Sequence, residues 1–350
     1  MEKVNNVQRL IRLTEDTILT LLLNNDLLDD AQREAVFKEI DALLDANEVE
    51  IQEMLRQDIE DSYKQGLLEA IQTVNNAYNI NAGYNFNLIH REALVTLLND
   101  SFRDLRSAYR TAKATSNKAI TSAINNVRTK ISQGVLLGQH TKTISLTVAN
   151  EFYNHGLKAF YTVDGKVLPL EFYASTVSRT KVAQARTQAH RNHYLDVNND
   201  LYKIQGSYDA CGECAKLHDV VFSITGNDPR FKKLDPNDIL PVHPNCRCTI
   251  IPYVDIYEDD EAVEEESKKS LNHNPDVDPR TQAQREMYER SQKINRRNRA
   301  EQKQYDEAKA LLGNEVPKTL GAFRRMKRNN TKGYKKLQSN LRQARKTIKE

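Results

Sequence analysis

This 350-residue sequence has no tryptophan, and cysteine, glycine and proline are scarce, at four, 12 and nine residues. No apolar run approaches the length of a membrane span, and the start MEKVNNVQRL lacks the charged and apolar regions of a signal peptide. Apolar residues make up 39% and charged residues 28%. We therefore expect a soluble, helix-rich protein with one or more small cores, made and kept in a reducing cytoplasm.

The net charge of +3 conceals an uneven distribution along the chain. Residues 280–350 carry 21 Lys and Arg against 7 Asp and Glu, whereas residues 1–279 carry 30 basic and 41 acidic side chains. The segment DIYEDDEAVEEE, residues 255–266, holds eight acidic residues in twelve and is typical of a solvated linker or polar strip. The asymmetry predicts a polyanion or an acidic partner for the C-terminal end.

Hydrophobic periodicity predicts helices over most of the chain and strands around the cysteines. Asp164-Gly165 is typical of a tight turn. The expected fold class is α+β, with a mostly helical N-terminal part, a small domain with short antiparallel strands around a Cys/His cluster, and a helical basic C-terminal arm. The expected helices cover residues 3–24, 47–77, 142–160, 170–193 and 280–312, and the expected strands cover 201–207, 220–224 and 248–254.

The four cysteines form two tight pairs, Cys211-x2-Cys214 and Cys246-x-Cys248, with 31 residues between Cys214 and Cys246. A C-x2-C turn places two thiolates on one side of a knuckle, as a tetrahedral Zn²⁺ requires. In a regular strand residues i and i+2 share a face, so Cys246 and Cys248 are expected to converge. The pattern predicts a closed structural zinc site with Cys211, Cys214, Cys246 and Cys248 as ligands.

Other interpretations of these residues stay open. His218 and His243 are spare ligand candidates, although an isolated histidine is more often an ordinary core residue. The cysteines can instead pack in a small core as reduced thiols or as disulfides. A redox C-x2-C centre is less favoured, since the βαβ context of a thioredoxin-like site is missing.

Two segments around the cysteines resemble the Mu F-like phage head morphogenesis family of minor head, or minor capsid, proteins. These segments are YDACGECAKLHDVVF, residues 208–222, and PVHPNCRCTIIP, residues 241–252. Arg-Thr pairs at 179–180 and 186–187 lie where that family carries an Arg-Thr helix, but Lys181 and Gln188 follow them in place of the family's Glu. No role of that Glu is therefore carried over. The resemblance covers roughly residues 115–254.

The resemblance implies a non-enzymatic virion component that lies inside the capsid and is made in the host bacterial cytoplasm. It implies association with the portal protein and with packaged double-stranded DNA, with the scaffold and the major capsid protein as further candidate partners, and a role in head assembly and DNA packaging or ejection. The expected organisation is a helical region over 1–114, the head morphogenesis domain over 115–254, an acidic linker over 255–279 and the basic helical arm over 280–350.

The basic arm is the candidate DNA-binding element, because Lys and Arg that neutralise phosphates bind DNA without sequence preference. The alternatives are a solvated helix and a strip that docks on an acidic protein surface. Phe323 and Tyr334 lie among the charges as candidates for stacking on bases. The candidate DNA-binding residues are Arg296, Arg297, Arg299, Arg324, Arg325, Lys327, Arg328, Lys335 and Lys336.

Two further functions compete with the head protein. A metal-dependent nuclease would recruit His218, Asp219 and His243, but it needs an open metal position, which four cysteines would close. A zinc-knuckle protein that reads specific DNA would need a recognition helix beside the knuckle. Between Cys214 and Cys246 no such helix is evident, and Gly226, Asn227, Asp228, Pro229 and Pro236 instead indicate a loop. No catalytic residue is assigned.

Overall fold

The computed structural model describes residues 2–81, 83–132, 141–161, 166–244 and 246–349. The chain folds into two compact units, each assembled from separated segments. Unit 1 comprises residues 1–51, 105–175 and 294–350, and unit 2 comprises 52–104 and 176–293. Their boundaries fall within helices, so four helices contribute residues to both units.

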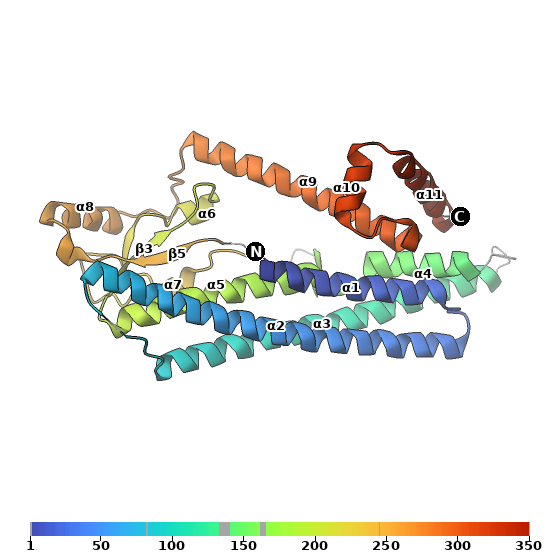
Figure 1. Cartoon of the computed structure of the whole chain (residues 1–350), viewed down its shortest axis with the longest axis horizontal. Coiled ribbons are helices and arrows are strands. Elements are labelled where there is room, and N and C mark those ends of the chain that lie inside the picture. Colours follow the sequence, from blue (N-terminus) through green and yellow to red (C-terminus); the bar gives the residue numbers. More distant parts are fainter. Residues whose placement is uncertain (1, 82, 133–140, 162–165, 245, 350) are drawn as a thin grey trace. The chain divides into compact units, whose positions relative to one another are not determined.

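Helices dominate the described residues, and the few strands are short and antiparallel, as predicted (Figure 1). The longer helices are α1 (Glu2–Asn24), α2 (Asp30–Tyr78), α3 (Leu88–Ser132), α4 (Thr141–His155), α5 (Leu170–Asp196), α8 (Asp260–Leu271), α9 (Gln282–Leu312), α10 (Leu320–Arg328) and α11 (Lys332–Lys349). The short elements are α6 (Gly212–Ala215), α7 (Pro236–Ile239) and the strands β1 (Lys158–Tyr161), β2 (Val167–Pro169), β3 (Leu201–Gln205), β4 (Val221–Ser223) and β5 (Thr249–Pro252).

Unit 1 is built on helices whose apolar residues recur every three or four positions. On α1, Ile11, Ile18 and Leu22 are almost fully buried, and α1 lies beside α4 (Figure 1). Strands β1 and β2 pair antiparallel. The predicted turn at Asp164-Gly165 lies outside the described residues, between these two strands.

The end of the basic arm folds around a small core of its own in unit 1. The ring of Phe323 packs in T-shaped contacts with Tyr305 and Tyr334, with ring centroids 5.6 and 5.9 Å apart. Leu337 and Leu341 of α11 complete this core. Thr319 caps α10 by accepting a hydrogen bond from the backbone N–H of Ala322. The apolar faces of α10 and α11 therefore pack inward, which leaves their basic faces to solvent.

An acidic cluster joins α1, α5 and α9 within unit 1. Gln302 donates a hydrogen bond to Asp306, and Lys309 pairs with Asp16 at 3.0 Å. Desolvation, together with the negative charge of Asp306, raises the pKa of Glu15 to about 8. Burial likewise raises the pKa of Asp306 to about 6. Both side chains are therefore easier to bury as neutral acids than as carboxylates.

This cluster predicts a stability that falls as the pH rises. The folded-state pKa of Glu15 lies above its unfolded value, so folding stability is lost between about pH 4.5 and about pH 8. Glu15→Gln should stabilise the protein at pH 8 by on the order of 2 kcal/mol, discounted for the partial exposure of the side chain, and by less at pH 5. Urea unfolding at both pH values measures the difference. Glu39→Gln, an exposed glutamate on α2, is the control and should show no pH-dependent gain.

Unit 2 contains a three-stranded antiparallel sheet with the order β4-β3-β5. Tyr202, Ile204, Phe222 and Ile250 are buried in one core with Tyr194 of α5. The three strands match the predicted β-prone segments to within a few residues. This sheet holds the segments that carry the cysteine pairs, since α6 follows β3 and Cys248 directly precedes β5.

The acidic segment after β5 forms helix α8 and packs against β4 within unit 2. Ser270 is fully buried, donates to the carbonyl of Val221 and accepts from the backbone N–H of Lys232. His273, just past the helix, makes a 2.8 Å hydrogen bond through Nε2 to the carbonyl of Lys216. Most acidic side chains of α8 are exposed, but Glu266 is half-buried and pairs with Lys203 of β3 at 3.1 Å, and the last turn fixes the helix to the sheet domain.

Candidate metal centre

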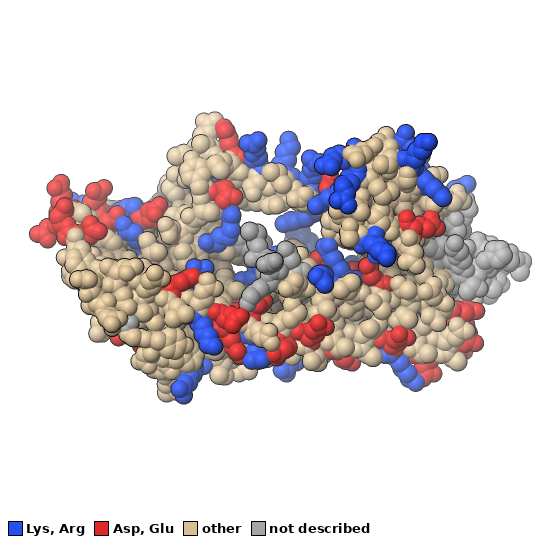
Figure 2. All heavy atoms as spheres, in the orientation of Figure 1, with Lys and Arg blue, Asp and Glu red and all other residues tan. Residues whose placement is uncertain are grey.

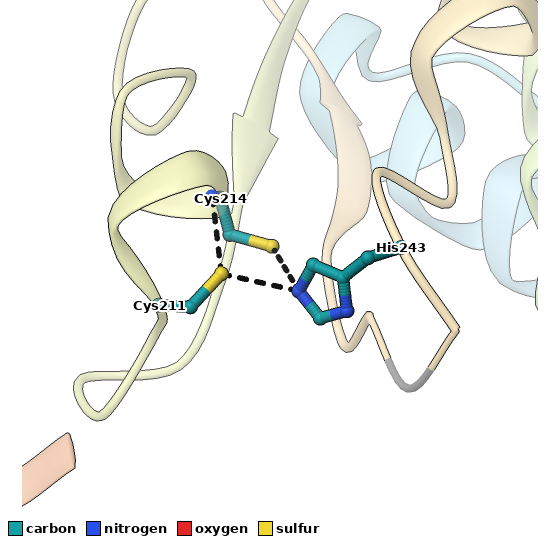
Figure 3. Close-up of side chains that lie close together, drawn as sticks. All are labelled: Cys211, Cys214 and His243. Atoms are coloured by element: carbon teal, nitrogen blue, oxygen red, sulfur yellow. Dashed lines mark hydrogen bonds between the residues drawn. The ribbon is translucent and has the colours of Figure 1, made fainter. Parts of the chain in front are cut away.

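The first cysteine pair lies on a tight knuckle at α6. Cys211 caps this short helix, and its Sγ accepts a hydrogen bond from the backbone N–H of Cys214 at 3.4 Å. The backbone N–H of Leu217 donates a hydrogen bond to the carbonyl of Cys214, and the N–H of His218 donates to the carbonyl of Ala215. These bonds fold the chain so that both sulfur atoms lie on one side of the turn (Figure 3).

The second pair lies on the loop that enters β5. The N–H of Cys246 bonds to the carbonyl of His243 at 2.9 Å, which closes a turn within HPNCRC; Asn245 lies outside the described residues. His243 points toward the knuckle, with Nε2 at 3.1 Å from Cys211 Sγ and 3.2 Å from Cys214 Sγ (Figure 3). The two loops therefore bring their side chains together from opposite sides.

Two groups of side chains in the described residues can hold a metal ion. One is Cys211, Cys214 and His243, and the other is Cys214, Cys246 and Cys248, so Cys214 belongs to both. Cys214 Sγ and Cys246 Sγ are 3.6 Å apart. Two thiolates on a tetrahedral Zn²⁺ are about 3.8 Å apart, for Zn–S bonds near 2.3 Å. The spacing of these sulfur atoms thus fits a tetrahedral ion, and neither group contains a carboxylate.

The cysteine thiols shift one another's pKa values because they lie in contact. Hydrogen bonds from the thiols of Cys214 and Cys248 lower the pKa of Cys246. The same interaction with Cys246 raises the pKa of Cys214. These opposite shifts in pKa arise because the sulfur atoms of Cys214 and Cys246 lie close to each other. A metal ion that replaces the thiol protons would stabilise all the thiolates together.

All four predicted cysteines lie in this cluster and none is in a disulfide. Cys246 and Cys248 converge as predicted, but on a loop, because β5 begins only at Thr249. Of the two spare histidines, His243 contacts both thiols of the first pair, and His218 Nε2 lies 3.3 Å from Cys248 Sγ. Both histidines thus touch the cluster, a proximity that the spacing alone gave no reason to favour.

Two arginines that the sequence did not single out brace the knuckle. Arg247, between the second pair of cysteines, donates to Asp209 just before the first pair at 2.6 Å. Arg280 is held by Asp278, donates to the carbonyl of Ala210 at 3.2 Å and lies over the ring of Tyr288. Neither arginine has a signal in the sequence that identifies its partner, because Asp209 lies 38 residues from Arg247 and Ala210 lies 70 residues from Arg280.

The backbone at Gly206 lies against His218. A Cβ at this position would be 2.0 Å from the Cε1 and Nε2 atoms of the imidazole. Gly206→Ala should therefore displace the ring from Cys248 and destabilise unit 2 by about 1–3 kcal/mol, the usual cost of overpacking. Chemical denaturation followed by fluorescence or circular dichroism measures this loss. Gly321→Ala is the control, since a Cβ there meets nothing within 4 Å and helix α10 should gain stability.

Some cations of the basic arm are held by other side chains of the protein, whereas others are exposed and make no ion pair among the described residues. Arg297 and Arg324 both pair with Glu301, and Lys327 donates to Gln304. Figure 2 shows Lys and Arg crowded over α10 and α11. In the described part of the chain, six of the nine candidate DNA-binding residues are exposed and make no ion pair: Arg296, Arg299, Arg325, Arg328, Lys335 and Lys336. Phe323 is 1% exposed and belongs to the core, so the prediction that it stacks on bases is wrong.

The model of the phage minor capsid protein 2 family matches residues 30–350, nearly the whole chain. The chain belongs to this family of phage minor capsid proteins. The predicted resemblance to minor head proteins is thereby confirmed, and the match extends well beyond the segment around the cysteines. No curated protein and no solved structure matches the chain. Among the described residues, none of the helices combines the length and apolar character that crossing a membrane requires.

Proposed function

We propose that this minor capsid protein lies inside the phage head, binds packaged double-stranded DNA through its basic arm and associates with the portal protein. In this role it acts without enzymatic activity during head assembly and DNA packaging or ejection. The scaffold and the major capsid protein are the other partners that such a position offers. Membership of the phage minor capsid family supports a place in the head, and the exposed cations of α9 to α11 support the contact with DNA.

The observation that carries the DNA contact is the set of unpaired cations. A Lys or Arg held in an ion pair must lose its partner before it binds a phosphate, whereas Arg325 and Arg328 of α10 and Lys335 of α11 have no acidic partner among the described residues. The packed core beneath them fixes the helices, so little order has to be gained on binding. Phosphate contacts of this kind carry no sequence specificity.

The location is tested on purified phage particles. Protease should leave the protein intact in sealed heads and cleave it once the heads are opened. Formaldehyde treatment of sealed heads should then cross-link peptides of residues 294–346 to DNA and cross-link other parts of the chain to the portal. Cleavage in sealed heads would contradict the internal position. Protection from protease in sealed heads without any peptide cross-linked to DNA would support the internal position but contradict the DNA contact.

We further propose that the cysteine cluster binds one structural zinc ion through Cys211, Cys214, Cys246 and Cys248. Four thiolates leave no open position for a substrate, which fits a fold-stabilising ion and argues against hydrolysis. When bound, the ion would join the α6 knuckle to the loop before β5. Arg247 would then brace the two loops through Asp209.

Plasma mass spectrometry of the purified protein tests the ligand set. The wild type and His243→Ala should each contain about one zinc per chain, and the Cys211→Ser and Cys248→Ser variants should contain much less. Loss of zinc from His243→Ala with retention in Cys248→Ser would instead identify His243 as the fourth ligand. A wild type without metal and with four titratable thiols would contradict the zinc site altogether.

A further inference from the structure

The last two helices of the basic arm are joined by a turn of only three residues. Helix α10 has nine residues and ends at Arg328, residues 329–331 form the turn, and α11 begins at Lys332 (Figure 1). A helix, a turn of three or four residues and a second helix make up the helix-turn-helix motif, whose second helix enters the major groove of DNA. The lengths of these elements therefore indicate which part of the arm meets DNA.

Backbone hydrogen bonds fix this turn. Asn330 has a φ of 44°, and its N–H donates to the carbonyl of Lys327 at 3.1 Å, while the N–H of Thr331 donates to the carbonyl of Met326 at 3.2 Å. These two bonds end α10 as a Schellman motif. Thr331 then caps α11, because its hydroxyl accepts a hydrogen bond from the N–H of Tyr334 at 3.1 Å. The turn therefore sets the direction in which α11 leaves α10.

Helix α9 supports both helices through the small core of the arm. Phe323 of α10 contacts the rings of Tyr305 on α9 and Tyr334 on α11. Arg345 of α11 pairs with Glu307 of α9 at 2.7 Å. Three helices around one core also hold the recognition helix of homeodomains. Helix α11 is thus ordered before it meets a partner and loses little conformational freedom on binding.

The two faces of α11 differ in chemistry. Leu337, Leu341 and Ala344 recur every three or four positions and are buried in the core. Helix α11 contains no Asp or Glu, and in the described part of the chain the four cations of its opposite face make no ion pair. That face is exposed and consists of Lys332, Lys335, Lys336, Ser339 and Arg342.

Ser339 lies at the middle of this exposed face. Successive residues of an α-helix are turned by about 100°, so Lys335 and Lys336 lie on either side of Ser339, one turn earlier. A helix with its side chains is about 10–12 Å across, which matches the major groove, about 12 Å wide, and exceeds the minor groove, about 6 Å wide. With Ser339 toward the floor of the major groove, the two lysines point toward the phosphates of its two walls.

We infer that α11 lies in the major groove of double-stranded DNA, with the face centred on Ser339 turned toward the base edges. In this position Arg325 and Arg328 of α10 meet the adjacent backbone, as the first helix of the motif does. A serine hydroxyl both donates and accepts hydrogen bonds, so the centre of the face accepts different base pairs. The inference rests on the proposed contact between the basic arm and DNA, and adds the helix and the groove.

Two duplexes of one sequence test the inference with the full-length protein. One contains ordinary cytosine, and the other contains glucosylated 5-hydroxymethylcytosine, whose sugar fills the major groove and leaves the number of phosphates unchanged. Fluorescence anisotropy at low salt should show binding to the glucosylated duplex that is about tenfold weaker or more. Equal affinity for the two duplexes would overturn the inference and leave the proposed DNA contact intact. Binding to neither duplex would contradict both.

Ser339→Tyr adds bulk at the centre of the face and leaves its charge unchanged. This variant should bind the ordinary duplex about tenfold more weakly or less tightly still, because the ring holds α11 away from the base edges. Ser107→Tyr is the matched control, since Ser107 is an exposed serine on helix α3, and it should bind like the wild type. Circular dichroism spectra that match the wild type establish that both variants are folded. Unchanged affinity in a folded Ser339→Tyr would overturn the inference, because a face that touches only phosphates has room for the ring.

Discussion

Cys214→Ser is expected to unfold the sheet domain of unit 2 while most of the long helices remain. Cys214 is the one side chain shared by both candidate metal-binding groups, and it is almost fully buried. If the proposed zinc is bound, its loss removes a large share of the folding free energy of so small a domain, since structural zinc contributes on the order of 10 kcal/mol in zinc-finger peptides. Hydrogen exchange should show lost protection over residues 201–252, with α1 and most of α3 still protected.

Ala215→Ser places the same new hydroxyl one residue further along the α6 turn and serves as the control. Ala215 is also buried, so this change should cost only about 1–3 kcal/mol and leave the metal content unchanged. A chelator added to the wild type should reproduce the exchange pattern of Cys214→Ser. Equal and intact protection in the wild type, the chelated protein and Cys214→Ser would show that the cysteines only pack.

DNA binding by the basic arm should depend steeply on salt. If the six exposed, unpaired cations each neutralise one phosphate, the slope of log K against log salt is about −5, and affinity falls by about a thousandfold from 50 to 200 mM salt. Replacing Arg325, Arg328 and Lys335 together by alanine should reduce this slope by about 2.7. Fluorescence anisotropy with a labelled duplex, measured at several salt concentrations, determines both slopes.

The control removes the same charge from elsewhere on the protein. Lys64, Arg106 and Arg110 are exposed on α2 and α3, and their triple alanine variant should keep the wild-type slope. If both triple variants reduced the slope by the same amount, the net charge of the protein, and not the arm in particular, would attract DNA. Arg297→Ala should also change little, because this side chain already pairs with Glu301.

Much of the fold could be predicted because the helices and strands are encoded locally. The spacing of Ile11, Ile18 and Leu22 predicts one buried face of α1, and the β-branched residues near Val221 and Ile250 predict strands. The docking of α8 could not be predicted. Its sequence is dominated by acidic residues, and its attachment depends on Ser270 and His273, whose partners are distant in sequence.

In the candidate site, too, locally encoded features could be predicted and contacts between distant segments could not. The spacing of the cysteine pairs predicted that the four thiols would meet, since each pair has a narrow choice of geometry. The approach of His243 to Cys211 and Cys214 depends on the path of the loop before β5, which no local pattern specifies. The burial of Phe323 was also not predicted. A single aromatic residue among charged residues does not indicate that a hydrophobic core lies beneath it.

Arg280 connects the start of the basic arm to the cysteine knuckle. It lies two residues before α9 begins, and its guanidinium is tied to the carbonyl of Ala210 at the foot of the cysteine knuckle. Tension applied along the first turns of α9 is therefore carried by this hydrogen bond and by the Asp278 ion pair into the α6 turn. A knuckle cross-linked by a metal would resist such a load, whereas one held only by thiol hydrogen bonds would yield to it.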